Sequence, residues 1–208
     1  MTSSSKFAAR CITSAIAFAA LTAVTAPAAD ANSALAPHAA SRVTLEFVKN
    51  AKDPSDSVLR VYDGKEIVNT FRAGSGLGTA ADHSKGKLTE EGALHRNDCA
   101  VRKGWLPNGT YKPTSFEINR NGAIKGYAIG LPNRACHTGK NVRSALFIHS
   151  EMTKDGKQGP PKGRDSSERW EGPQDYKSEG CIKLHPDHIA WLFSHMNRHG
   201  RATSVTVR

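Results

Sequence analysis

Acidic residues, aromatic residues and cysteines are all scarce in this chain of 208 residues. Asp and Glu number 19 against 29 Lys and Arg, which gives a formal net charge of +10, and aromatic residues make up 7%. With 38% apolar and 23% charged residues, the composition excludes a polytopic membrane protein and a disordered acidic chain. The length leaves room for one ordinary domain or two small ones.

Charged residues are absent from a long stretch near the N-terminus. Residues 11–24 are uncharged and mostly apolar; two basic residues precede them, and small residues with Ala-x-Ala motifs follow. This layout is typical of a secretory signal peptide, and the stretch is shorter than the ~20 residues of a spanning helix, which disfavours an uncleaved anchor. The sequence therefore predicts an exported protein with a signal peptide over residues 1–31, a spacer over 32–41 and one domain over 42–208. No membrane span is expected once the signal is removed.

The chain also lacks a basic run interleaved with aromatic residues and a phosphate-binding loop. The glycines of residues 74–78 are followed by polar residues instead of a helix, so neither nucleic acid nor a nucleotide cofactor is expected. A basic exported protein meets polyanions such as cell-wall polymers. Cell-wall polyanions are therefore candidate partners, although a merely solvated surface explains the charge equally well.

Alternation of apolar and polar residues predicts a mainly β domain. Val43, Leu45 and Phe47 occupy alternate positions, which is the period of a half-buried strand. Asp63-Gly64, between two further runs, is a strong hairpin signal. Residues 79–104 are polar and are predicted to be irregular. Strands are predicted over residues 43–48, 57–62, 66–72, 110–119, 124–131, 144–149 and 204–208.

One helix is predicted in the C-terminal region. Pro186 suits the first helical position and Gly200 suits the end, while the apolar residues between them recur at i, i+3, i+4 and i+7. Histidines at 188, 195 and 199 share one side of this helix without an acidic or thiol ligand, so we favour a solvated surface over a metal site and expect no metal. Before the helix, residues 151–177 are rich in Gly, Pro and charge and are predicted to form a long, functional or disordered loop.

One cysteine and one histidine stand where catalysis would need them. Cys181 follows Gly180, whose backbone can turn tightly and admit a substrate, and His149 closes a predicted strand that would hold its imidazole rigidly. A thiol needs a base or a positive neighbour to react at neutral pH. From these residues alone, a catalytic pair and a merely buried thiol both remain open.

The order of these residues resembles the catalytic signature of the L,D-transpeptidases, the YkuD-type domain. The resemblance is carried by a strand ending in His149-Ser150, a loop, and then Ser178-x-Gly180-Cys181. Residues 58–71 with the following Gly-Ser-Gly look like the family's opening hairpin and turn, and residues 106–111 look like a later segment. The resemblance covers roughly residues 43–208.

The resemblance implies a YkuD-like β-sandwich catalytic domain that needs no cofactor and acts on peptidoglycan stem peptides. It implies that Cys181 is the nucleophile, that His149 is the general base, and that Ser150 orients the imidazole through its carbonyl. An acyl-enzyme on Cys181 would be resolved by the amine of a second stem, which gives a 3→3 cross-link. Oxyanion stabilisation and substrate binding would fall to Ser178, Glu179, Gly180 and Lys183.

Glu179 departs from the family pattern, which has a histidine at this position. A carboxylate beside the thiol raises the thiol pKa unless Lys177 or Lys183 offsets it. The family histidine is a secondary site residue, so its absence removes neither the nucleophile nor the base.

The spacing is a second departure, since 32 positions separate His149 from Cys181, more than is usual in the family. The surplus falls in residues 151–177, which we interpret as an enlarged lid. Trp170 and Tyr176 are candidates either to line this lid or to pack beneath it.

Other functions remain open on the same scaffold. Water in place of the amine would make the protein an L,D-carboxypeptidase, and Glu179 makes a degenerate wall-binding module conceivable, although the retained His149 and Cys181 argue against it. A papain-like peptidase has its Cys before its His, and a sortase needs an Arg after its Cys, where this chain has Lys183 followed by a helix.

The cysteine count leads to a disulfide prediction. Without the signal, three cysteines remain, and an odd number in an exported protein leaves one thiol over. If Cys181 must stay free for chemistry, the disulfide joins Cys99 to Cys136, and oxidising surroundings permit it. Two unpaired thiols are the alternative, because geometry decides the pairing.

Overall fold

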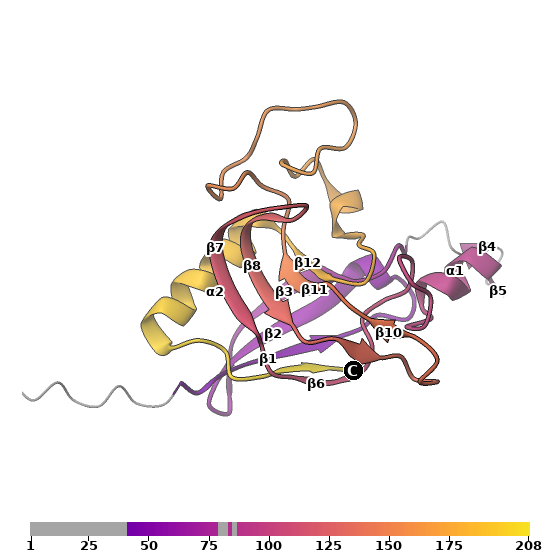
Figure 1. Cartoon of the computed structure of the whole chain (residues 1–208), viewed down its shortest axis with the longest axis horizontal. Helices are drawn as coiled ribbons and strands as arrows, with labels where there is room; N and C mark the ends of the chain where they lie inside the picture. The colour runs from indigo at the N-terminus through magenta and orange to yellow at the C-terminus, as the bar shows by residue number, and fades with distance from the viewer. Residues whose placement is uncertain (1–40, 79–82, 85–86) are drawn as a thin grey trace, which may run out of the picture. The chain divides into compact units, whose positions relative to one another are not determined.

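A curled sheet of nine strands is the main secondary structure of the domain (Figure 1). The computed structural model describes residues 41–78, 83–84 and 87–208, so the predicted signal peptide and nearly all of the predicted spacer lie outside the described residues. In spatial order the strands are β6 (Gly109–Tyr111), β13 (Val205–Val207), β1 (Val43–Val48), β2 (Ser57–Asp63), β3 (Glu66–Gly74), β12 (Ile182–Leu184), β11 (Leu146–His149), β8 (Lys125–Leu131) and β7 (Ser115–Asn121).

Two small sheets and two 3-10 helices accompany the large sheet. The small sheets pair β9 (Arg134–Ala135) with β10 (Val142–Arg143) and β4 (His83–Ser84) with β5 (Lys87–Leu88). The 3-10 helices are η1 (Pro54–Asp56) and η3 (Pro173–Tyr176). The prediction of a mainly β domain is confirmed.

Side-chain alternation places the first strands on the core. Val43, Leu45 and Phe47 of β1 are fully buried, and the residues between them are partly exposed. The predicted hairpin is confirmed, since β2 and β3 pair antiparallel across a turn in which Gly64 has φ +65°, a conformation that glycine adopts without strain. The last strand, β13, pairs parallel to β1 and lies between β1 and the edge strand β6.

Two strand predictions need correction. Residues 110–119 were expected to form one strand but divide between β6 and β7, because Pro113 has no N–H to give to a ladder. Strand β12 was not predicted, since it has three residues with Lys183 in the middle. It nevertheless lies between β3 and β11, and all three of its residues are buried.

The predicted C-terminal helix is confirmed as α2 (Pro186–His199). The His185 ring accepts a hydrogen bond from the Asp187 N–H at 3.3 Å at its start, and Gly200 with φ +93° ends it. Its buried stripe of Ile189, Leu192 and Met196 joins the main core. Tyr127 of β8 packs against Phe193 at 4.8 Å between ring centroids.

A second helix, α1 (Glu90–His95), corrects the prediction that residues 79–104 are irregular. The Thr89 hydroxyl accepts a hydrogen bond from the Gly92 N–H at 3.0 Å and caps the helix. With only six residues, of which three are polar, the helix has no apolar periodicity that pattern analysis could detect. Neither helix within the described residues is long and apolar enough to cross a bilayer.

The expectation of solvated histidines on α2 is wrong for His195. Only 5% of this residue is exposed, because its ring is stacked between Trp191 at 4.9 Å and His199 at 4.3 Å. His188 stacks on Phe71 of β3 at 4.6 Å. These histidines serve as flat packing surfaces along the border of the apolar stripe.

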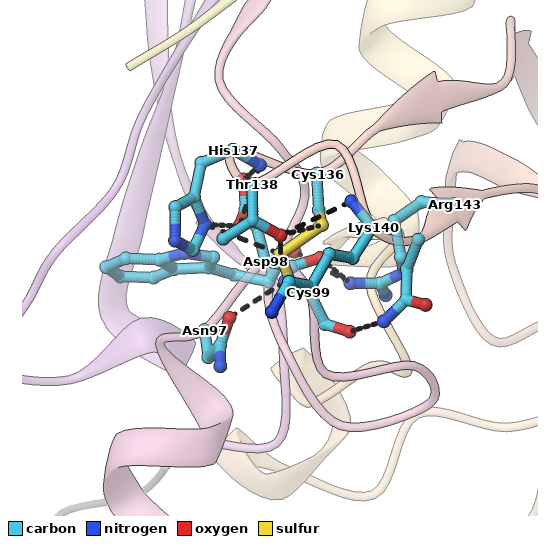
Figure 2. Close-up of a disulfide and its surroundings, with 10 residues drawn as sticks. Asn97, Asp98, Cys99, Cys136, His137, Thr138, Lys140 and Arg143 are labelled. Carbon is cyan, nitrogen blue, oxygen red and sulfur yellow. Dashed lines mark hydrogen bonds and ion pairs between the residues drawn. A yellow bond between two sulfur atoms is a disulfide. The ribbon is translucent and has the colours of Figure 1, made fainter.

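Cys99 and Cys136 are joined by a disulfide (Figure 2). Cys181 is the free cysteine among the described residues. The bridge ties the segment after α1 to the turn between β9 and β10. Around it, the Asp98 carboxylate contacts the His137 ring and accepts the His137 N–H at 3.2 Å.

We predict that protein produced without residues 1–31 has one reactive thiol when it is denatured without reductant, and three after reduction. Loss of the bridge in Cys99→Ser/Cys136→Ser should lower the free energy of unfolding by about 3–4 kcal/mol in the chain-entropy model, because the open chain gains loop freedom. Thiol titration, peptide mapping and urea denaturation measure these quantities. Three thiols before reduction, or a linked peptide that contains Cys181, would contradict the pairing.

Candidate active site

Two parallel strands bring the predicted cysteine and histidine to one place. Strand β11 ends at His149, β12 begins directly after Cys181, and the register pairs Ile148 with Ile182 and His149 with Lys183. Because side chains alternate between faces, Cys181 and Lys183 lie on the same side as His149. All three line one cavity of about 820 Å³, together with Ser150, Ser178 and Glu179.

The His149 ring is held by the backbone of its neighbour. Its Nδ1 lies 3.0 Å from the Ser150 carbonyl oxygen, which can only accept, so Nδ1 carries the proton and Nε2 has the free lone pair. Burial lowers the pKa of His149 to about 3, and the positive charge of Lys183 acts in the same direction. The imidazole is therefore neutral at pH 7 and able to accept a proton.

The Cys181 thiol is also neutral at rest. Burial raises its pKa to about 11, while the backbone N–H of Phe147 and the charges of Lys183 and Arg143 act to lower it. Its Sγ lies 3.5 Å from the Ala145 carbonyl oxygen. Because both groups line one cavity and both are neutral, a proton could pass from the thiol to the imidazole only as the thiol reacts, which is what general-base catalysis would require.

Ser178 fixes the turn that precedes the cysteine. Its Oγ donates to the Cys181 carbonyl at 2.6 Å and accepts the N–H of Gly180 at 3.2 Å and of Gly76 at 3.3 Å. The Ser178 N–H also donates to the Gly76 carbonyl at 2.9 Å. Because the Gly180 N–H is engaged with Ser178, the Cys181 N–H is the remaining backbone donor at the Gly180-Cys181 step.

Glu179 points to the surface and pairs with Arg102 at 3.0 Å, with 59% and 78% of the two side chains exposed. Lys183 acts to lower the pKa of Cys181 more strongly than Glu179 acts to raise it, so the expected offset by Lys183 is present. Of the charges that act on the pKa of Cys181, Glu179 contributes least. Where the family pattern has a histidine, this chain therefore has a carboxylate that pairs with Arg102 and acts only weakly on the pKa of the thiol.

Lys183 makes a buried ion pair with Glu151, a residue that the sequence analysis did not single out. The two residues are 7% and 8% exposed, and burial raises the pKa of Glu151 to about 7 against the opposing charge of Lys183. The pair places a fixed positive charge beside His149 and Cys181. Its only sequence signal is an acid two positions after the histidine that ends the strand.

Four carboxylates of the loop of residues 151–177 gather in one place: Glu151, Asp165, Glu171 and Asp175. One oxygen from each lies within 4.8 Å of the others. Oxygen ligands of this kind suit a hard cation such as Ca²⁺. Lys183 already supplies one positive charge to the group through Glu151, and Asp175 accepts the Gly172 N–H at 2.8 Å.

The two aromatic residues proposed for the lid pack against each other. The rings of Trp170 and Tyr176 lie 4.8 Å apart, with His185 beside Trp170 at 5.4 Å and Arg72 over the Tyr176 ring at 4.5 Å. Neither is among the residues that line the cavity. Of the two alternatives, their geometry favours packing beneath the loop.

Arg143 is the second residue that sequence analysis missed. It lies in β10, is 3% exposed, lines the cavity and donates to the Glu179 carbonyl at 2.8 Å. A lone arginine before an apolar strand gives no sign of this contact, because its partners are backbone carbonyls.

Similar structures have low sequence identity. They include Bd1075 of Bdellovibrio bacteriovorus (13% identity, TM-score 0.43, 81% of this chain and 48% of that one) and L,D-transpeptidase 1 of Mycobacterium tuberculosis (15%, 0.37, 80% and 62%). An L,D-transpeptidase from Mycobacterium smegmatis has 15% identity and a TM-score of 0.37, and the match covers 80% of this chain and 59% of that one. The chain thus spans about half to three-fifths of these proteins, and no curated protein matches it.

The family assignment comes from a different comparison. A model of the L,D-transpeptidase catalytic domain, YkuD, matches residues 52–207, which include every strand and helix that contributes to the cavity. The chain therefore belongs to the YkuD family of L,D-transpeptidase catalytic domains.

Proposed function

We propose that this protein is an exported peptidoglycan L,D-transpeptidase that forms 3→3 cross-links through an acyl-enzyme on Cys181. The observation that carries the proposal is that His149 ends β11 and Cys181 directly precedes the parallel neighbour β12, so that both line one cavity. Membership of the YkuD family supports the reaction class. The basic net charge suits a protein that works among cell-wall polyanions.

In the first step, the Cys181 Sγ attacks the carbonyl that links the third residue of a stem tetrapeptide to its terminal D-residue. The thiol proton passes to His149 Nε2 and then to the leaving amine, while the amide C–N bond breaks and a thioester forms. The Cys181 N–H is the proposed donor to the oxyanion.

In the second step, the side-chain amine of another stem attacks the thioester. His149 Nε2 removes a proton from this amine, the thioester C–S bond breaks, and the proton returns to Cys181. Ser150 keeps the imidazole in the required tautomer through its carbonyl. The ammonium of Lys183 stabilises the thiolate as it forms, because it is buried on the same face.

The reaction products distinguish a transpeptidase from an L,D-carboxypeptidase and from a wall-binding module. Purified protein lacking residues 1–31 would be incubated with a disaccharide-tetrapeptide and analysed by mass spectrometry. A dimer that has lost one terminal D-residue supports the proposal. Tripeptide without dimer would overturn it in favour of an L,D-carboxypeptidase, and unchanged substrate, with Cys181 still open to alkylation, in favour of a wall-binding module.

Cys181→Ala and His149→Ala are each expected to lower turnover by about 10³-fold or more, because one removes the nucleophile and the other its base. Circular dichroism should show that both variants fold. His199→Ala, an exposed histidine on α2, is the matched control and should retain turnover. Turnover by Cys181→Ala protein at the wild-type rate would rule out the acyl-enzyme.

Glu179→Gln is expected to change the rate of Cys181 alkylation by iodoacetamide at pH 8 by less than about threefold, because the pair is exposed and ion pairs of this kind are weak. Glu179→His, which restores the family residue, should behave alike. The measurement is the loss of free thiol with time. A tenfold acceleration in either variant would mean that the carboxylate acts directly on the thiol.

A further inference from the structure

Arg143 is almost fully buried. In the part of the chain that the structure describes, its hydrogen bonds go only to backbone carbonyls. Figure 2 shows it beside the disulfide and Asp98. Its guanidinium donates to four carbonyls: Nη1 to Asp98 at 2.7 Å and Trp105 at 3.3 Å, Nη2 to Gly104 at 3.2 Å and Glu179 at 2.8 Å. Three acceptors belong to the segment after α1, and the fourth belongs to the turn before Cys181.

The first three contacts form a rigid frame. The Cys99–Cys136 disulfide and the contact between Asp98 and His137 bind this segment to the β9–β10 hairpin, which also carries Arg143. The N–H donors of a guanidinium have fixed directions in one plane. A guanidinium that is held by one set of carbonyls therefore fixes the position of any other carbonyl that it binds.

The fourth contact controls the peptide next to the nucleophile. Gly180 has φ +119°, and a Cβ there would lie 2.1 Å from Arg143 Nη2, so the guanidinium fills the space that the glycine leaves. The Glu179 carbonyl and the Gly180 N–H belong to one planar peptide, and Arg143 and Ser178 bind its two ends. With that plane fixed, only the Gly180 dihedrals separate it from the Cys181 N–H.

We propose that Arg143 is a positioning residue, whose fork fixes the Glu179–Gly180 peptide so that the Cys181 N–H meets the oxyanion when Cys181 is acylated. The inference rests on the acyl-transfer role of Cys181 in the proposed function. It does not depend on which peptide is the substrate.

Two reactions of Cys181 separate positioning from thiol reactivity. Acetylation by p-nitrophenyl acetate forms an S–acetyl bond, breaks the ester C–O bond, releases p-nitrophenolate and gives the thiol proton to His149, and it passes through an oxyanion. Alkylation by iodoacetamide forms an S–C bond and releases iodide without any oxyanion. A stem peptide is needed for neither reaction, so failure of this inference is distinct from failure of the proposed function.

Arg143→Lys keeps the positive charge near the thiol but loses the fork. We expect acetylation to slow by about 10- to 100-fold, in the range seen when an oxyanion donor is lost, while alkylation stays within about threefold of the wild-type rate. Arg102→Lys is the matched control, because Arg102 touches the side chain of Glu179 and not its carbonyl. Both of its rates should match the wild type.

The ratio of the two rates decides the matter. Equal losses in both reactions of Arg143→Lys, or no loss in either, would overturn the proposal, and so would a wild-type thiol that is alkylated but never acetylated. If Arg143→Lys does not fold, Gly180→Ala gives the second test, because its Cβ must displace the guanidinium or tilt the peptide. The same selective loss of acetylation is expected there, and an unchanged ratio would overturn the proposal.

Discussion

The parallel pairing of β11 with β12 is the constraint on which the site depends. It fixes His149 opposite Lys183 and sets Cys181 two positions earlier on the same face. Neighbours on both sides hold the pair, with β8 against β11 and β3 against β12. The connection between two parallel strands must be long, and here it supplies the loop of residues 151–177 that borders the cavity.

Burial gives the site its electrostatic character. It raises the pKa of Cys181 and lowers that of His149, so both groups are uncharged before substrate arrives. Lys183 forms a buried ion pair with Glu151, but the carboxylate does not cancel the effect of the ammonium on the thiol. Lys183 still acts to lower the pKa of Cys181. In the proposed mechanism, reactivity then depends on proton transfer at the moment of attack and on the position of the backbone around Cys181.

Local chemistry made much of this predictable from sequence. The alternation in residues 43–48, the Asp63-Gly64 turn and the capped helix after Pro186 all recur in the structure, because each is decided by neighbours along the chain. The Cys99–Cys136 pair also matches what cysteine counting suggested. What escaped prediction is decided by distant partners: β12 is a strand only because β3 and β11 lie on either side of it.

The same distinction applies to the site. Cys181, His149 and Ser150 were identified from their order, whereas Arg143 and Glu151 act through contacts with residues more than thirty positions away. Glu179 was singled out as a departure from the family pattern, but its partner Arg102 could not be found from spacing, because the pair is 77 residues apart.

The pH dependence of Cys181 alkylation tests the central claim, that thiol and imidazole are both neutral at rest. Protein lacking residues 1–31 would be treated with iodoacetamide between pH 5 and 10.5, and the Cys181 peptide would be quantified by mass spectrometry. The account predicts a rate that keeps rising above pH 9, as expected for a thiol with a pKa of about 11. A rate that is already constant between pH 5 and 8 would mean a preformed thiolate–imidazolium pair and would contradict it.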